Sequence, residues 1–221
     1  MSLISYSELI DCVVNKGVII GVDDLSYVNG ASIDIRLGSE IYIETQPLLS
    51  CPACHTRHMQ TYANTASRND PVYCARCNTT APLVDWMSCV DFAAKQPLAM
   101  KTIDISKEPY KLFPGEACLA HSVEVFNLPM DITAEFRLKS SQARVFLEHL
   151  HAGLADPGWH GSVLTMEFVN MSRYHPLLLR AGDKCGQMTF SRHEPVPEER
   201  SYKVRGSYNN DLGATQSKGV K

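Results

Sequence analysis

Four cysteines form two Cys-x-x-Cys pairs, Cys51 with Cys54 and Cys74 with Cys77, and nineteen residues separate the pairs. Two thiolates from each of two tight turns match the tetrahedral coordination of Zn²⁺. Four thiolates leave no position for water, so the pattern predicts a structural zinc rather than a catalytic one. A pair of disulfides is the alternative, which the absence of a secretion signal disfavours.

A second cluster of polar residues lies between residues 137 and 170. Lys139, Ser140 and Ser141 stand where a helix is expected to begin, and Arg144 follows one turn later. Backbone amides, hydroxyls and two cations at one place suit a phosphate group. An ordinary helix start with solvated charges accounts for the same residues equally well.

The sequence Asp-Pro-Gly-Trp, from Asp156 to Trp159, indicates a tight turn. By itself it is better explained as a plain turn than as a site. In a small-molecule site, its carboxylate would bind a sugar hydroxyl and its indole would stack on a ring.

Glu167 lies in an alternating apolar run from residue 163 to 169, on one face with Thr165 and Val169. A carboxylate in the middle of such a strand needs a partner or a function. For this reason we treat Glu167 as a candidate catalytic base. The ordinary alternative is that it lies on an exposed face of a sheet.

The elements that position these residues are expected to be mostly short strands. Ser5 and Glu8 have capping-box spacing, which predicts a helix that ends near Gly17, and residues 140–150 have the spacing of a second helix. Alternating or apolar runs predict strands at 17–21, 32–37, 40–44, 100–105, 117–121, 123–126, 163–169, 177–179 and 187–190, with Gly38 as a turn. This pattern predicts a mostly β fold, a distorted β-barrel or jelly roll with short helices.

The segment from residue 45 to 86 is polar and contains both Cys-x-x-Cys pairs. We interpret it as a small inserted zinc knuckle that needs its metal to fold. Residues 1–44 and 87–221 would then form the host domain. The remaining cysteines, Cys12, Cys89, Cys118 and Cys185, are expected to be buried small apolar residues.

Composition excludes several classes of protein. The chain has 221 residues, is 44% hydrophobic and 20% charged, and has a net charge of −3. These values are typical of globular proteins and argue against a protein that coats nucleic acid. No apolar run approaches the roughly 18 residues of a membrane span, and no signal peptide is evident, so we expect a cytoplasmic location.

The order of these motifs resembles the dCTP deaminase branch of the dUTPase-like superfamily. The resemblance rests on Lys-Ser-Ser-Gln-Ala-Arg at 139–144, Asp-Pro-Gly-Trp-His-Gly at 156–161, Glu167 with Phe168 and Asn170, and Asn-Gly-Ala-Ser-Ile-Asp-Ile-Arg-Leu-Gly at 29–38. The tail adds Ser207, Tyr208, Gly213 and Ser217. The resemblance covers residues 1–44 and 98–217. The insertion is unlike the compact members of the family, which suggests a phage-type protein in a bacterial or phage-infected cytoplasm.

The resemblance implies a dUTPase-like homotrimer with active sites shared between subunits. Its substrate would be a pyrimidine deoxynucleoside triphosphate that carries Mg²⁺, and zinc would take no part in the deamination. Glu167 would activate water for attack on C4 of cytosine, while Ser140 and Arg144 would orient the glutamate and the water. The residues that match substrate-binding positions are Lys139, Ser141, His151, Ala152, Asp156, Trp159, Tyr202, Tyr208 and Asp211.

Four positions depart from the family pattern. Lys139 replaces the usual arginine, His151 a common threonine, Asp211 a common glutamine and Ser207 a common lysine. The expected reaction is the conversion of dCTP to dUTP and ammonia. The departures leave open a modified cytosine nucleotide or a monophosphate as the substrate. The alternative enzyme of the same superfamily is a dUTPase-like pyrophosphatase, acting alone or as a bifunctional deaminase–diphosphatase.

Two further classes are disfavoured. A zinc-dependent deaminase needs a His-x-Glu motif, and none of the eight histidines begins one. A binding module without activity would have no need of Glu167, Ser140 and Arg144 together.

Overall fold

The computed structural model describes residues 2–46, 48–58, 67–91, 93–94 and 98–219. The chain divides into two compact units, residues 1–43 with 101–216 and residues 44–100 with 217–221. Within the described ranges, no helix is both long enough and apolar enough to cross a membrane.

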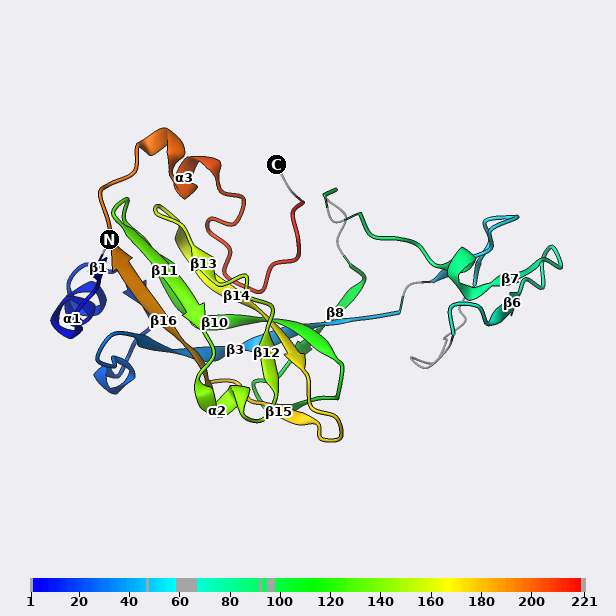
Figure 1. The fold of residues 1–221 in the computed structure, drawn as a ribbon, viewed down its shortest axis with the longest axis horizontal. Helices are drawn as coiled ribbons and strands as arrows, with labels where there is room; N and C mark the ends of the chain where they lie inside the picture. Colours follow the sequence, from blue (N-terminus) through cyan, green and yellow to red (C-terminus); the bar gives the residue numbers. More distant parts are fainter. Residues whose placement is uncertain (1, 47, 59–66, 92, 95–97, 220–221) are drawn as a thin grey trace. The chain divides into compact units, whose positions relative to one another are not determined.

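An antiparallel sheet forms the first unit, in the strand order β12-β14-β10-β3-β16-β11-β13, with β1 paired to β16, β2 to β10 and β8 to β3 (Figure 1). Strands β9 and β15 pair separately. This mostly β architecture confirms the expected fold class. The strands are β1 (Ser2–Leu3), β2 (Ile19–Ile20), β3 (Ile33–Glu44), β8 (Met100–Asp104), β9 (Tyr110–Leu112), β10 (Ala117–Asn127), β11 (Ile132–Arg137), β12 (Leu147–His149), β13 (Leu154–Ala155), β14 (His160–Asn170), β15 (Leu177–Leu179) and β16 (Lys184–Arg192).

Short helices join these strands. The first, α1 (Tyr6–Val14), begins with the predicted capping box between Ser5 and Glu8. The others in this unit are α2 (Ser140–Ala143), α3 (Tyr202–Arg205), and the 3-10 turns η1 (Leu25–Tyr27) and η3 (Glu198–Arg200). The apolar faces of the sheet and of α1 meet in one core that includes Ile33, Ile41, Phe126, Met166 and Phe168.

The predicted turn at Gly38 is wrong, because residues 33–44 form one continuous strand, β3. Gly38 is needed there for a different reason. A Cβ atom at this position would lie 2.1 Å from Cε1 of the His121 ring, on the neighbouring strand β10. Only glycine leaves room for that ring.

The predicted helix over residues 140–150 is also wrong after its first turn. Phe146 has a φ of 64°, a left-handed conformation that ends a right-handed helix. The carbonyl of Phe146 then accepts a hydrogen bond from Met171 N–H, and residues 147–149 continue as strand β12 against β14. The chain therefore turns from helix to sheet edge within a few residues.

The second unit contains two similar hairpins. One pairs β4 (Leu49–Ser50) with β5 (Arg57–His58), and the other pairs β6 (Pro71–Tyr73) with β7 (Thr80–Pro82), followed by the 3-10 turn η2 (Leu83–Trp86). Its small core consists of Leu49, Cys51, Cys74, Leu83 and Trp86.

The expectation that the remaining four cysteines are buried is only partly correct. Cys12, Cys118 and Cys185 are buried, each within the sheet unit, whereas Cys89 is exposed. Cys89 follows η2 in the small second unit, which has too few apolar residues to cover it.

Candidate active site and metal centre

Glu167 lies in the middle of β14, between the buried residues Met166 and Phe168. Its side chain is 27% exposed, and the strand alternation places it on the face of Thr165 and Val169, as the sequence predicts. Its Oε2 atom is buried and has no hydrogen-bond partner in the described part of the chain. A carboxylate oxygen left in this state is available to a ligand or to water.

His149, the last residue of β12, lies beside this oxygen. Its Nε2 atom lies 3.3 Å from Glu167 Oε2, and it too is buried without a hydrogen-bond partner among the described residues. The ring packs against Phe136 and Phe168, with centroids 4.9 and 6.0 Å away. His149 is not among the residues predicted from the sequence, because the spacing over residues 140–150 favours a helix there. A strand assignment would have placed its ring beside β14.

The residues at the start of α2 do not reach Glu167 within one chain. Ser140 and Arg144 are both exposed, and neither makes a hydrogen bond or ion pair with Glu167 in the structure as described. The backbone N–H of Arg144 donates to the carbonyl of Ser140, which closes the single helical turn. Ser141 is also exposed, and its hydroxyl donates to Oε1 of its neighbour Gln142.

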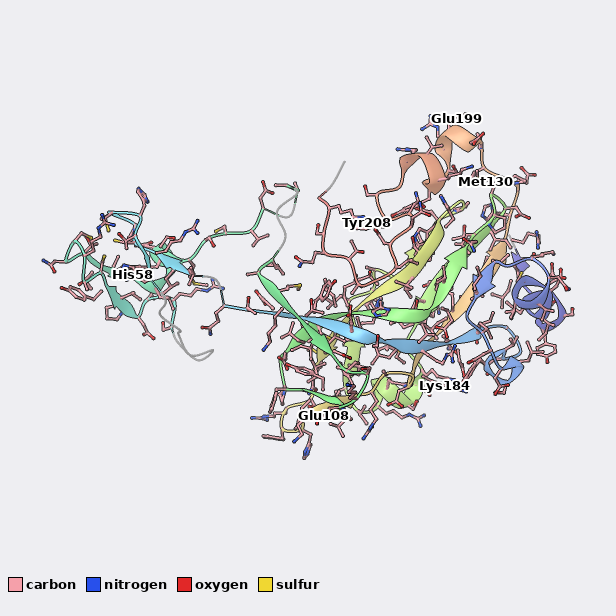
Figure 2. The ribbon with its side chains drawn as sticks, turned by 180° about the vertical axis from the view of Figure 1, so that it is seen from behind. His58, Glu108, Met130, Lys184, Glu199 and Tyr208 are labelled. Atoms are coloured by element: carbon pink, nitrogen blue, oxygen red, sulfur yellow. The ribbon has the colours of Figure 1, made fainter. Side chains whose placement is uncertain are left out.

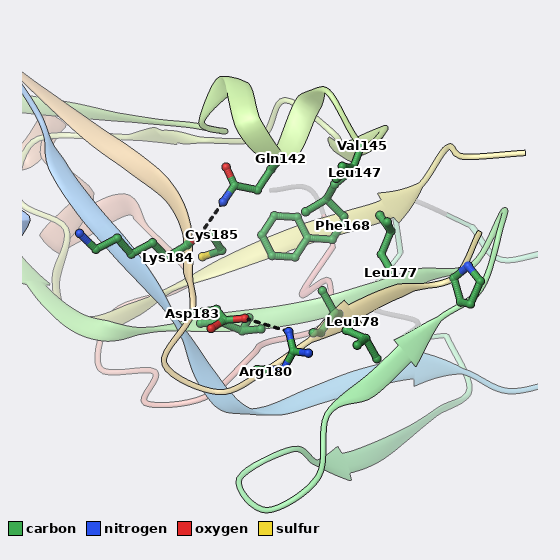
Figure 3. A pocket seen from close by; sticks show the side chains of 13 residues that line it. Gln142, Val145, Leu147, Phe168, Leu177, Leu178, Arg180, Asp183, Lys184 and Cys185 are labelled. Carbon is green, nitrogen blue, oxygen red and sulfur yellow. Dashed lines mark hydrogen bonds and ion pairs between the residues drawn. The ribbon is translucent and has the colours of Figure 1, made fainter. Parts of the chain in front are cut away.

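Lys139 is held by a buried aspartate. Asp34, whose side chain is 2% exposed, accepts from Lys139 Nζ at 2.6 Å, from Lys184 Nζ at 2.9 Å and from Asn29 Nδ2 at 2.7 Å. Burial acts to raise the pKa of Asp34, but these hydrogen bonds outweigh it and the net pKa is lowered. The network, together with a bond from Gln142 Nε2 to the Lys184 carbonyl, fixes α2 on the sheet (Figure 3).

A second group of predicted residues gathers around the beginning of β14. Trp159 is 7% exposed and stacks on Phe126, with ring centroids 5.3 Å apart. Its indole N–H donates to the Tyr208 carbonyl at 2.8 Å, and the Ser162 hydroxyl donates to the same oxygen at 2.9 Å. The structure thus brings the predicted Trp159 to the C-terminal segment, on which Figure 2 labels Tyr208.

The C-terminal segment then follows β14 in the same direction. Asn210 N–H donates to the carbonyl of His160, Asp211 bonds to Ser162 and Val163, and Thr215 N–H donates to Thr165 Oγ1 at 3.1 Å. Tyr202 connects this part of the chain to the turn at residues 156–159, because its backbone N–H donates to the Pro157 carbonyl. Burial raises the pKa of its phenol. The tail therefore reaches the face that carries Glu167.

Three predicted residues lie on exposed loops. The His151 side chain is 91% exposed, with Nε2 3.5 Å from Glu148 Oε1, and its φ of 56° turns the chain sharply. Ala152 next to it is exposed, and Asp156 is exposed at the start of the predicted turn. The Asp156 carbonyl accepts from Trp159 N–H at 3.2 Å, as a turn requires.

An apolar cavity of about 390 Å³ lies on the other side of β14. Figure 3 shows Val145, Leu147, Phe168 and Leu177 around it, with Arg180 and Asp183 at one edge. Because Phe168 and Glu167 are consecutive in a strand, they point to opposite faces. This cavity is therefore separate from the Glu167 site.

The four cysteines of the second unit converge as the sequence predicts. Their Sγ atoms all lie within 4.8 Å of one another, with Cys51 to Cys77 at 3.5 Å and Cys54 to Cys74 at 3.7 Å. Zinc–sulfur bonds of about 2.3 Å in a tetrahedron require sulfur–sulfur distances of about 3.8 Å. The group can hold a metal ion of this size.

Both hairpins present their cysteines in the same way. In each, the residue after the second cysteine has a positive φ, 55° at His55 and 58° at Asn78. Hydrogen bonds involving Thr56 lower the pKa of Cys54 to about 6, and those involving Thr79 lower the pKa of Cys77. Burial raises the pKa of Cys74 to about 11, and His58 Nε2 lies 3.2 Å from its sulfur.

A family model described as dCTP deaminase-like matches residues 75–193, more than half of the chain. This chain belongs to the dCTP deaminase-like family. Over 133 residues it is 35% identical to a dUMP-forming dCTP deaminase of Leifsonia xyli, a match that covers 58% of this chain and 65% of that protein. Over 115 residues it is 40% identical to a dUMP-forming dCTP deaminase of Nocardioides, covering 50% of this chain and 59% of that protein.

A longer match is to a dCTP deaminase of Photorhabdus laumondii, 29% identical over 196 residues, covering 86% of this chain and 84% of that protein. The chain spans less than two thirds of the first two relatives' lengths. The crystal structure of 2'-deoxycytidine 5'-triphosphate deaminase from Agrobacterium tumefaciens matches with a TM-score of 0.56 and 17% identity, over 87% of this chain and 48% of that chain. This match shows a shared fold, which agrees with the family assigned to the chain.

Proposed function

We propose that this protein hydrolyses the amino group of a deoxycytidine nucleotide, converting dCTP to dUTP and ammonia, with Glu167 as the general base. The observation that carries the proposal is the buried Oε2 atom of Glu167 on β14, which makes no hydrogen bond among the described residues and has His149 Nε2 3.3 Å away. Family membership and relatives named dCTP deaminase support the choice of substrate.

The chemistry needs one carboxylate in two roles. Glu167 takes a proton from water as its oxygen attacks C4 of cytosine, which gives a tetrahedral intermediate. The same carboxyl then passes that proton to the amino group, and ammonia leaves as the C4 carbonyl forms. The second proton of the water ends on N3 of the uracil ring. One group can serve both steps because it alternates between base and acid.

The reaction also needs donors for the negative charge that develops around the tetrahedral intermediate as C4 is attacked, and Ser140 with Arg144 would supply them. Both side chains are exposed on α2 and unattached to Glu167 in one chain. We infer that a neighbouring subunit of a homotrimer brings them to Glu167. Lys139 and Ser141, on the same short helix, would bind the phosphates of the magnesium nucleotide. Asp156 would bind the sugar, while Trp159, which is buried against Phe126, would hold the turn that carries Asp156.

A second outcome has specific support. Relatives with 35% and 40% identity are named as dUMP-forming. If this chain shares that property, it also cleaves the nucleotide between its α- and β-phosphates and releases pyrophosphate. Assaying ammonia and pyrophosphate from the same sample separates the two reactions.

We assign zinc to Cys51, Cys54, Cys74 and Cys77, with a structural role. Four sulfur atoms at the separations of a tetrahedral thiolate site support it, and so does the very small apolar core of that unit. The ion would stabilise the two hairpins and leave the deamination to Glu167.

Substitution of the base tests the function. Glu167→Gln should lower ammonia release from dCTP by at least ~100-fold while dCTP still binds. Full activity in this variant would exclude Glu167 as the base.

The sharing of active sites between subunits has its own test. Co-expressed Glu167→Gln and Arg144→Ala chains should regain roughly a quarter of the wild-type sites, because some subunit pairs combine an intact Glu167 with an intact Arg144.

A further inference from the structure

The described chain has three buried side-chain polar atoms without a hydrogen-bond partner. They are Glu167 Oε2, His149 Nε2 and Gln216 Oε1. Two of them are 3.3 Å apart at the proposed reaction centre. The third belongs to the C-terminal segment, at a position that the sequence analysis did not select. Buried polar atoms without a hydrogen bond are rare in folded proteins. Glu167 Oε2 and His149 Nε2 at least face each other, whereas no partner is given for Gln216 Oε1 in the described chain, so this atom calls for a partner from outside it.

The course of the tail directs Gln216 toward this centre. The tail advances along β14 in parallel, from Asn210 at His160 to Thr215 at Thr165. One residue further along the tail is Gln216, and two residues further along β14 is Glu167. Thr165 and Glu167 share a face of the strand and are separated by about 7 Å, a distance that the Gln216 side chain can span from the tail.

We propose that the Gln216 carboxamide recognises the pyrimidine ring of the substrate, with Oε1 accepting a hydrogen bond from the exocyclic amino group of cytosine. This inference rests on the proposed function. Cytosine presents an N–H donor at C4, which satisfies the unpartnered Oε1. Uracil carries a carbonyl at that position, whose lone pairs would face those of Oε1. Gln216 is therefore a specificity-determining residue that favours the substrate over its deaminated product.

The same segment offers a matched control. Leu212 is 71% exposed on the tail, so its truncation changes the tail without touching the proposed contact. Gln216→Met keeps the length of the side chain and removes the amide. Both variants are made in the Glu167→Gln background, where turnover does not consume the nucleotide, and the dissociation constants of dCTP and dUTP are measured by calorimetry with Mg²⁺ present.

Gln216→Met should weaken dCTP binding by about tenfold and leave dUTP binding within about twofold, which removes the preference for the substrate. Leu212→Ala should change neither constant. Equal weakening of both nucleotides would show that Gln216 only helps the tail to close, and no change would show that it does not face the ligand. Either result overturns the inference while the proposed function stands. If the otherwise wild-type chain releases no ammonia from dCTP, the proposed function fails, and the inference fails with it.

Discussion

The Nε2 atom of His149 lies 3.3 Å from Oε2 of Glu167, and both atoms lack a hydrogen-bond partner in the part of the chain described by the structure. Glu167 comes from a central position of β14 and His149 from the edge strand β12. Packing of the histidine ring between Phe136 and Phe168 limits its movement. We interpret His149 as a positioning residue for the proposed base.

Replacing His149 tests this relationship. His149→Phe fills the same space between the two phenylalanine rings but removes the nitrogen beside Glu167. We expect kcat for ammonia release to fall about tenfold or more, with KM for dCTP within about twofold, because the base is less well placed rather than the nucleotide. His149→Gln restores a polar atom and should recover part of kcat. A rise in KM alone would assign the residue to nucleotide binding instead.

The four-cysteine group should bind about one zinc ion per chain, measurable by elemental analysis. Cys51→Ser or Cys74→Ser should abolish this binding and increase hydrogen exchange in residues 44–100, since these cysteines are part of the small core of that unit. Cys89→Ser is the matched control, because Cys89 is exposed and outside the group. Ammonia release should persist in all three variants. Its loss together with zinc from a folded protein would place the metal in the reaction.

Asp34 should make the protein sensitive to acid. Its pKa is lowered in the folded state by hydrogen bonds from Lys139, Lys184 and Asn29, relative to 3.8 when unfolded. The aspartate therefore stabilises the fold above its unfolded pKa, and this contribution is lost as pH falls through the lower native value. Asp34→Asn should cost about 1–3 kcal/mol of unfolding free energy near pH 7 and flatten the decline below pH 4.

Denaturant unfolding across this pH range measures the effect of Asp34. The control is Asp183→Asn, because Asp183 is 57% exposed and its nitrogen partner on Arg180 is 3.8 Å away. Asp183→Asn should leave the free energy of unfolding nearly unchanged across this pH range. Equal acid sensitivity in wild-type protein and Asp34→Asn would contradict the role given to this network.

Gly38 should be intolerant of any side chain. Gly38→Ala places a methyl group 2.1 Å from the His121 ring, so the ring or the strand must move. We expect a loss of about 1–3 kcal/mol of stability, seen as a lower thermal midpoint. Gly30→Ala should leave the thermal midpoint nearly unchanged, because nothing lies within 4 Å of the position its Cβ atom would take. Similar midpoints for the two variants would show that His121 can leave its position at little cost.

The sequence alone determined the local features of this protein. The paired cysteines, the capping box at Ser5, and the alternation around Glu167 depend on neighbours in the chain, and the structure shows each of them as expected. Family membership followed from the order of short motifs, and the comparisons confirm it.

Only the tertiary structure decided which distant residues meet. Local spacing indicated a helix at residue 149, whereas pairing with β14 makes this segment a strand and turns His149 toward Glu167. The same holds for Gly38, whose role depends on a ring 83 positions away in the sequence, and for Asp34, which meets Lys139. Strand pairing and burial act between segments far apart in the chain, so short-range periodicity does not indicate which of these segments meet.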